Sequence, residues 1–214
     1  GLAISPENRR RASESLIDVM VKLHAVDPDA IGLGDLAKRE DWVGRQLKRW
    51  TTQWEQSKTR ELPEMEQVRD LLAARKPEQI HTGIVHGDYR LGNCLVSRDS
   101  GDVVAVLDWE LCTLGDVMAD VGYLLVYYSD EGNSARREND PSGSPGFLSR
   151  REMLQRYADA TGRDLGVVPY YEAFSCWRLA CISEGVLARY KAGVMGDDAY
   201  DTGSMADGTK MLAL

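Results

Sequence analysis

Two short stretches carry the strongest signal in this sequence: HGDYRLGN at residues 86–93 and LDWE at residues 107–110. Short apolar runs with β-branched residues surround them and are typical of strands. Between the two stretches lies RDSG at residues 98–101, a turn-forming cluster of the kind that closes a hairpin. The pattern predicts a loop followed by a β-hairpin over residues 84–110.

The expected geometry of this hairpin brings two oxygen-bearing side chains together. With the turn at residues 98–101, Asn93 lies opposite Val106 and Asp108 lies opposite Leu91. Asn93 and Asp108 are then diagonal neighbours on one face, about 7 Å apart. An amide oxygen and a carboxylate can share one hard cation, and Mg²⁺ uses few protein oxygens together with water and phosphate oxygens. The spacing predicts a Mg²⁺ and phosphate site.

Asp88 lies in the loop that enters the hairpin, beyond the end of the preceding strand. A carboxylate there can accept the proton of a substrate hydroxyl while a metal holds a phosphoryl group in line. Arg90 can neutralise charge that develops on the transferred oxygens. Gly87 and Gly92 allow the tight backbone path that such a loop needs. We therefore expect Asp88 to be a catalytic base and Arg90 a catalytic cation.

Three further polar residues are candidates for supporting this site. Asp120 shares the apolar face of a predicted helix, where a carboxylate needs partners. We expect it to accept backbone N–H groups from residues 86–88, and the alternative is a solvent-facing aspartate. His86 is interpreted as a hydrogen-bonded brace of the loop rather than a proton donor. Glu110 is a possible additional contact to metal or substrate.

Helical periodicity flanks the hairpin on both sides. The predicted helices span residues 5–25, 39–57, 64–76, 116–128, 148–162 and 167–192. Residues 129–146 are rich in Ser, Gly, Asn and Pro and predict a long loop, and residues 193–214 form an acidic tail. The fold class is therefore mainly α with a small β-hairpin.

The composition of the chain argues against some classes of binding partner. The 214 residues include 26 Lys and Arg against 34 Asp and Glu, a formal net charge of −8, which argues against nucleic acid and anionic membranes as partners. No apolar stretch is long enough to cross a bilayer, and the N-terminus lacks the plan of a signal peptide. Four cysteines without a CxxC pair indicate reduced thiols and a cytoplasmic location.

HGDYRLGN with the downstream VLDWE resembles the aminoglycoside phosphotransferase/choline kinase family, whose catalytic loop resembles that of eukaryotic protein kinases. The segments YADATGRDL and FSCWRLACISEGVLARY are similar to the branch found as kinase-like domains fused to acyl-CoA dehydrogenases, so the resemblance covers most of residues 5–192. It implies ATP-dependent transfer of the γ-phosphate to an alcohol group of a small molecule. By analogy Asp88 is the base, Asn93 and Asp108 bind Mg²⁺, and Arg90 replaces a phosphate-contacting lysine.

A kinase of this type also has a strand-rich lobe that binds ATP, with a glycine loop and a strand lysine. Gly32-Leu33-Gly34 is only a lone fragment between helices, and Lys22 sits within a helical pattern. Residues 1–214 are therefore expected to be the C-terminal catalytic and acceptor-binding lobe, with the N-terminal ATP lobe absent from this chain. The isolated lobe is expected to be inactive.

Other functions stay open at this stage. A kinase-fold binding or regulatory module without turnover is the main alternative, although the retained Asp88, Asn93 and Asp108 favour an enzyme. A metal phosphoesterase would need more metal ligands than this loop supplies.

The acceptor is also open. The net charge suits a cationic aminoglycoside or choline-like compound, whereas the resemblance points to a hydroxylated acyl compound. Substrate contacts are expected from the loop at 129–146 and the last helix. The candidates on that helix are Tyr170, Tyr171 and Arg178.

Overall fold

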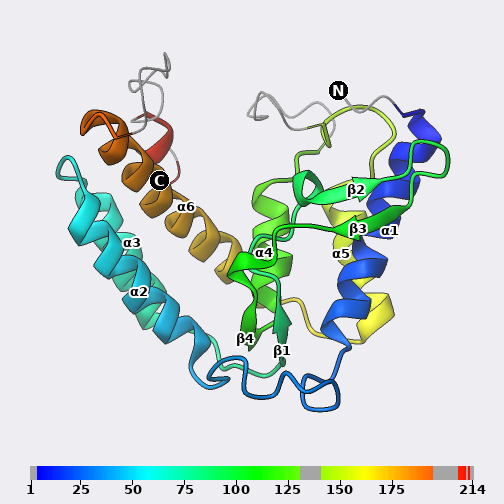
Figure 1. Ribbon diagram of the computed structural model, residues 1–214, viewed down its shortest axis with the longest axis horizontal. Coiled ribbons are helices and arrows are strands. Elements are labelled where there is room, and N and C mark those ends of the chain that lie inside the picture. The colour runs from blue at the N-terminus through cyan, green and yellow to red at the C-terminus, as the bar shows by residue number, and fades with distance from the viewer. Residues whose placement is uncertain (1–3, 131–140, 195–206, 211, 213–214) are drawn as a thin grey trace.

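The computed structural model describes residues 4–130, 141–194, 207–210 and 212 (Figure 1). The fold is mainly helical with two small antiparallel sheets, so the predicted fold class is confirmed. The helices are α1 (Pro6–His24), α2 (Trp42–Ser57), α3 (Pro63–Ala74), α4 (Met118–Val126), α5 (Arg150–Thr161) and α6 (Val168–Lys191). The strands are β1 (Thr82–Val85), β2 (Cys94–Val96), β3 (Val103–Val106) and β4 (Thr113–Asp116), with 3-10 turns η1 (Leu91–Asn93) and η2 (Trp109–Leu111).

The long helix α6 organises the packing. It crosses α4 and also contacts α2 and α3, which run beside it, while α1 packs against α5 on the other side of the molecule (Figure 1). The core between these layers is rich in aromatic residues, among them Trp42, Tyr157, Phe174 and Trp177. Trp50 and Trp54, one turn apart on α2, are buried in the same core. Among the described residues, no helix combines the length and apolar character needed to cross a bilayer.

The helix ends differ from the predicted bounds where local chemistry overrides periodicity. Helix α2 begins at Trp42 rather than at residue 39, because Asp41 adopts a left-handed conformation with φ 47° that a helix cannot contain. Helix α5 begins after Ser149, which forms a capping box with Glu152, and ends at Gly162 in the left-handed conformation. Most of the predicted tail at 193–214, and residues 131–140 of the predicted loop, lie outside the described residues.

The strand β4 corrects the prediction of a helix starting at residue 116. Residues Thr113–Asp116 instead pair antiparallel with β1, and Val85 lies opposite Thr113. Helix α4 starts only at Met118, whose backbone N–H donates to Asp116 Oδ1 at 3.0 Å. The loop of residues 86–93 begins at the end of β1. Because β1 pairs with β4, the start of this loop lies beside the segment that follows Asp108.

The hairpin is present, but its predicted register is wrong by one residue near the site. Ser97 N–H donates to Asp102 O at 2.8 Å, as the turn requires, but the register shifts between Leu95 and Val96. Cys94, not Asn93, therefore lies opposite Val106. The shift is a bulge-like irregularity, which sequence alternation does not reveal.

Gly122 of α4 provides a stability test of the packing between α4 and α6. A Cβ atom there would come within 2.6 Å of the Tyr171 backbone carbon, so we expect Gly122→Ala to destabilise the fold by overpacking, by about 1–3 kcal/mol. The melting temperature should fall by about 3–10 °C. The matched control is Gly185→Ala in α6, where the new Cβ meets only side chains at 3.5 Å or more. Equal melting temperatures for both variants would contradict this account.

Candidate active site

Asp120 fixes the loop that carries the HGD motif. It is fully buried in α4, and its Oδ2 and Oδ1 atoms accept the backbone N–H groups of His86 and Gly87 at 2.7 and 2.8 Å. Gly87 has φ +85°, and a Cβ there would come within 2.7 Å of the Leu111 carbonyl oxygen. The loop is therefore held at two consecutive amides, and its tight conformation depends on a glycine.

His24 is a member of this network that the sequence analysis missed. The imidazole is buried at the end of α1, with Nε2 3.4 Å from Asp120 Oδ2 and Nδ1 2.8 Å from the Tyr157 hydroxyl. Arg163 donates to that hydroxyl at 2.7 Å and to the His24 carbonyl oxygen at 3.1 Å. A lone histidine in a helical pattern offers no sequence signal of this role, because its partners come from distant segments.

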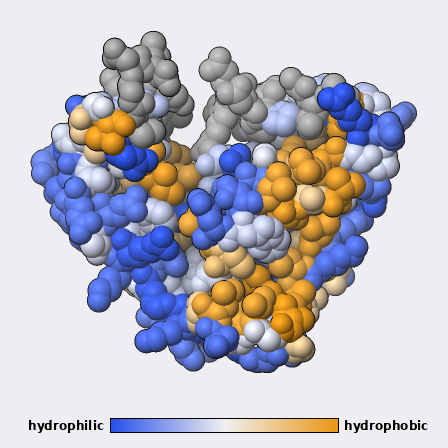
Figure 2. Space-filling view, viewed as in Figure 1, coloured by the Kyte–Doolittle hydropathy of each residue, from blue (hydrophilic) through white to orange (hydrophobic). Residues whose placement is uncertain are grey.

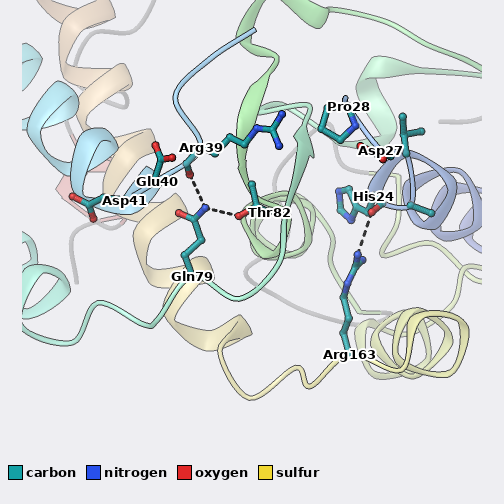
Figure 3. A pocket seen from close by; sticks show the side chains of 11 residues that line it. His24, Asp27, Pro28, Arg39, Glu40, Asp41, Gln79, Thr82 and Arg163 are labelled. Atoms are coloured by element: carbon teal, nitrogen blue, oxygen red, sulfur yellow. Dashed lines mark hydrogen bonds between the residues drawn. The ribbon is translucent and has the colours of Figure 1, made fainter. Parts of the chain in front are cut away.

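His24 and Arg163 also line one wall of a surface hollow of about 740 Å³ (Figure 3). Its other wall carries Arg39, and Gln79 links the Arg39 carbonyl oxygen to the Thr82 hydroxyl with hydrogen bonds of 2.6 and 2.8 Å. None of the residues that line this hollow belongs to the HGD loop, although His24 joins it to Asp120 behind that loop.

The hydrogen bonds of His86 define its tautomer. The Asp88 N–H donates to Nδ1 at 3.2 Å, so Nδ1 carries no proton and Nε2–H donates to the Leu107 carbonyl oxygen at 3.0 Å. The imidazole therefore joins the loop to the residue that precedes Asp108. Its ring lies against that of Trp109, with centroids 4.7 Å apart and planes tilted by 55°.

The Asp88 carboxylate is half-buried and oriented by hydrogen bonds. Arg90 Nε lies 3.3 Å from Oδ1, and Asn93 Nδ2 donates to Oδ2 at 2.7 Å and to the Asp88 carbonyl oxygen at 2.9 Å. The Arg90 guanidinium lies over the Tyr127 ring, 5.1 Å from its centroid. Burial raises the pKa of neighbouring Tyr123, and a hydrogen bond with Asp88 acts in the same direction, so this hydroxyl stays neutral.

The candidate metal ligands have the donor chemistry that a hard cation needs. Because the Asn93 amide nitrogen is engaged by Asp88, its oxygen Oδ1 is the atom left to bind a ligand. Asp108 is exposed, has φ 66° and precedes η2, while Leu107 N–H donates to the Asn93 carbonyl oxygen at 2.8 Å. Within the described residues no group of three or more His, Cys, Asp or Glu side chains is arranged to hold a metal ion. An amide and a carboxylate therefore suit a cation that takes its other ligands from water and phosphate.

Two nearby features refine the sequence predictions. Glu110 lies exposed in η2 and lines a cavity of about 170 Å³ together with Gly87 and Arg178. Tyr170 and Tyr171 are not brought to this cavity. Tyr171 is fully buried, and the Tyr170 hydroxyl donates to the Leu72 carbonyl oxygen at 2.9 Å, so both belong to the packing at the start of α6.

A mainly helical fold with two small antiparallel sheets, in which a loop fixed by Asp120 precedes a β-hairpin, is the protein-kinase-like fold of the aminoglycoside phosphotransferases. The chain belongs to the phosphotransferase enzyme family, whose model matches residues 2–166. A Ralstonia eutropha protein assigned provisionally to the aminoglycoside phosphotransferases has a crystal structure with a TM-score of 0.85 and 32% identity, covering 100% of this chain and 65% of that one.

Two further proteins are similar to this chain. The mouse acyl-CoA dehydrogenase family member 10 is 32% identical over 219 residues, which cover 98% of this chain and 20% of that protein. The structure of amicoumacin kinase with AMP-PNP, Ca²⁺ and its ligand has a TM-score of 0.62 at 16% identity, covering 99% of this chain and 61% of that one. The chain thus spans less than two thirds of each relative described here.

Proposed function

We propose that the chain is the catalytic and acceptor-binding lobe of an ATP-dependent phosphotransferase that acts on an alcohol group of a small molecule. The observation that carries this proposal is the Asp88 carboxylate, oriented by Asn93 and Arg90 on a loop that Asp120 fixes. A base must keep its position relative to the attacking hydroxyl, and a loop held by its own backbone amides supplies that preorganisation.

The proposed roles follow from the contacts. Asp88 accepts the proton of the acceptor hydroxyl, and Asn93 holds the carboxylate in the orientation required. Arg90 lies over the Tyr127 ring and beside the carboxylate, where its charge can neutralise negative charge that develops on the transferred phosphoryl oxygens. His86 acts as a brace, since both of its ring nitrogens are engaged by backbone groups.

The proposed cofactor is Mg²⁺, bound with ATP. Asn93 Oδ1 and the Asp108 carboxylate would hold it, and Glu110 is close enough in the chain to add a contact. When bound, the cation neutralises phosphate charge and orients the transferred group. Amicoumacin kinase, crystallised with a nucleotide analogue and Ca²⁺, supports a nucleotide with a divalent cation in this fold.

An exposed apolar surface supports the proposal that an ATP-binding lobe completes the site. Leu95, Val104, Leu107 and Trp109 are between 42% and 66% exposed on the hairpin and η2. Figure 2 shows hydrophobic side chains gathered over the region of β2 and β3. Such a surface is typical of contact with another protein unit, and we propose the protein's own N-terminal lobe as that unit.

The test of the proposed function is ADP release by the full-length protein with ATP, Mg²⁺ and a set of hydroxylated acceptors. The set should include aminoglycosides, choline-like amines and hydroxyacyl compounds. ADP release that depends on one acceptor would support the enzyme. Nucleotide binding without turnover on any acceptor would favour the alternative, a kinase-fold binding or regulatory module.

Asp108→Asn tests the proposed metal ligands. We expect this variant to need a higher Mg²⁺ concentration for half-maximal activity and to bind Mg²⁺-ATP at least about tenfold more weakly, because a neutral amide is a poorer ligand for a hard cation. The Mg²⁺ titration of activity gives the measurement, and Asp99→Asn in the exposed hairpin turn is the control. An unchanged Mg²⁺ titration for Asp108→Asn would remove Asp108 from the metal site.

A further inference from the structure

The peptide unit between Gly87 and Asp88 orients the proposed base. The Gly87 carbonyl and the Asp88 N–H lie in one rigid plane that ends at the Cα atom of Asp88. Gly87 has φ +85° and no Cβ atom, so on its own it would let this plane rotate through orientations closed to other residues. Each such rotation would carry the Asp88 carboxylate to a different place. The position of the base therefore depends on what holds this one peptide.

Both polar atoms of this peptide are bound by side chains. The Asp88 N–H donates to His86 Nδ1 at 3.2 Å, a partner from within the loop. The Gly87 carbonyl oxygen accepts from a guanidinium nitrogen of Arg178, which lies 91 residues further along the chain, on α6. Asp120 binds the Gly87 N–H, which belongs to the preceding peptide. Among the described residues, Arg178 is thus the only group outside the loop that hydrogen-bonds this peptide.

Arg178 is itself held in place. The residue is 5% exposed, and its guanidinium carbon lies over the Tyr123 ring of α4 and the Trp50 ring of α2, at 4.5 and 5.7 Å from their centroids. Cation–π attraction stabilises a buried guanidinium in such a position. In the part of the chain that the structure describes, Arg178 forms no ion pair, and the Gly87 carbonyl oxygen is the one acceptor that it reaches. Its hydrogen bonding is therefore directed at the loop.

The sequence pattern made Arg178 a candidate for contact with substrate. A residue in that role presents a donor to the ligand, whereas the hydrogen bond of Arg178 goes to the backbone of the loop. The burial of its side chain and this bond favour a role that acts through the loop and not directly on the substrate.

We propose that Arg178 is a positioning residue, which holds the Gly87–Asp88 peptide in one orientation and thereby fixes where the Asp88 carboxylate meets the acceptor. This inference rests on the proposed function of Asp88. A misplacement of about 1 Å at a reacting centre can cost about 10²-fold in rate, so a partial turn of this peptide is enough to slow the transfer. Because α6 carries Arg178 and packs against α2, α3 and α4 (Figure 1), the position of the base is tied to the helical core.

Hydrogen–deuterium exchange of the full-length protein tests the hold on the loop without requiring turnover. Arg178→Met removes the donors, keeps a long side chain and leaves the Gly87 carbonyl without its partner. We expect the amides of residues 86–88 to exchange about tenfold faster or more, because a charge-assisted hydrogen bond is lost, while the amides of α1 and α5 exchange as in the wild type. Arg189→Met, exposed on the same helix, is the control and should leave the loop unchanged.

Two exchange results would overturn the proposal. The first is wild-type exchange at residues 86–88 in Arg178→Met. The second is an equal increase throughout the chain, which would show that Arg178 only stabilises the fold as a whole.

The division of the effect between kcat and KM separates positioning from substrate binding. With an acceptor found in the test of the proposed function, Arg178→Met should lower kcat by about tenfold or more and leave KM for ATP and for the acceptor within about threefold of the wild type. A substrate contact would instead raise KM for the acceptor while kcat is retained, and this result would overturn the proposal.

Arg178→Lys keeps the test decisive if Arg178→Met does not fold. It retains the positive charge but replaces the planar fork of donors with one flexible ammonium group. We expect loop exchange that is severalfold faster than in the wild type and a kcat that is severalfold lower, with unchanged KM values. In that case wild-type loop exchange in Arg178→Lys would overturn the proposal.

This inference and the proposed function can fail separately. If Arg178→Met loosens the loop but the wild type consumes no ATP with any acceptor, the phosphotransferase proposal fails, while the hold of Arg178 on the loop stands. If the wild type consumes ATP and Arg178→Met keeps both its loop exchange and its kcat, the positioning role fails and Asp88 is unaffected as the candidate base.

Discussion

Replacing Asp88 by asparagine is expected to reduce ATP-dependent phosphate transfer by about 10²- to 10⁴-fold, the usual contribution of a general base. The amide is nearly the same size as the carboxylate and can still accept from Asn93, whose Nδ2 donates to Asp88 at 2.7 Å. It cannot take a proton from the acceptor, however, and it loses the charge that faces Arg90. The rate constant should therefore fall while the melting temperature changes little.

The measurement is the rate of ADP release by the full-length protein at saturating ATP, together with a thermal unfolding curve. Asp99→Asn is the control, because Asp99 is exposed in the hairpin turn and makes the same change of charge away from the site. Activity of Asp88→Asn within a fewfold of the wild type would show that Asp88 is not the base.

The second large effect is expected from Asp120→Ala. The carboxylate accepts the backbone N–H groups of His86 and Gly87 in a fully buried position. Its removal leaves two buried donors without a partner, which costs about 2–6 kcal/mol. The melting temperature should fall by about 5–20 °C. Activity should fall as well, by about 10²-fold, because a small displacement of the loop misplaces Asp88.

Thermal unfolding and ADP release of the full-length protein provide the two measurements. Asp70→Ala is the control, since its side chain is 69% exposed on α3. Asp120→Asn should recover part of the stability, because its one amide oxygen can still accept one of the two N–H groups. A melting temperature for Asp120→Ala equal to that of Asp70→Ala would show that the loop does not depend on this carboxylate.

Local chemistry made several parts of this fold predictable from sequence. The helix that starts at Ser5 and Pro6 has a capping residue followed by a proline at the first helical position, and α1 begins there. The hairpin turn at 98–101 was predictable because its residues favour turns. Asp120 was a candidate because a carboxylate on an apolar helical face requires partners, and the structure shows the two amides that it binds.

Other features depend on contacts between distant segments and leave little trace in the sequence. Thr113–Asp116 forms a strand because β1 is available as its partner, although the segment continues into a helical pattern. The register shift after Leu95 moves Asn93 out of the ladder and into η1. Arg178 acquires its surroundings from Trp50, about a hundred and thirty residues earlier, and from Tyr123. No periodicity encodes such pairings.

The proposed base, Asp88, and the proposed metal ligand, Asp108, are held by different parts of the molecule. Asp88 is tied through the HGD loop to Asp120 and thus to the helical core, whereas Asp108 stands at the end of the separate hairpin sheet. The His86 imidazole lies between the two, where it accepts a hydrogen bond from the Asp88 N–H and donates one to the Leu107 carbonyl oxygen. Because the imidazole ring is rigid, these two hydrogen bonds fix the separation between the HGD loop and Leu107. A displacement of the hairpin sheet relative to the helical core would change the position of Asp108 relative to Asp88, and the two hydrogen bonds of His86 oppose that displacement.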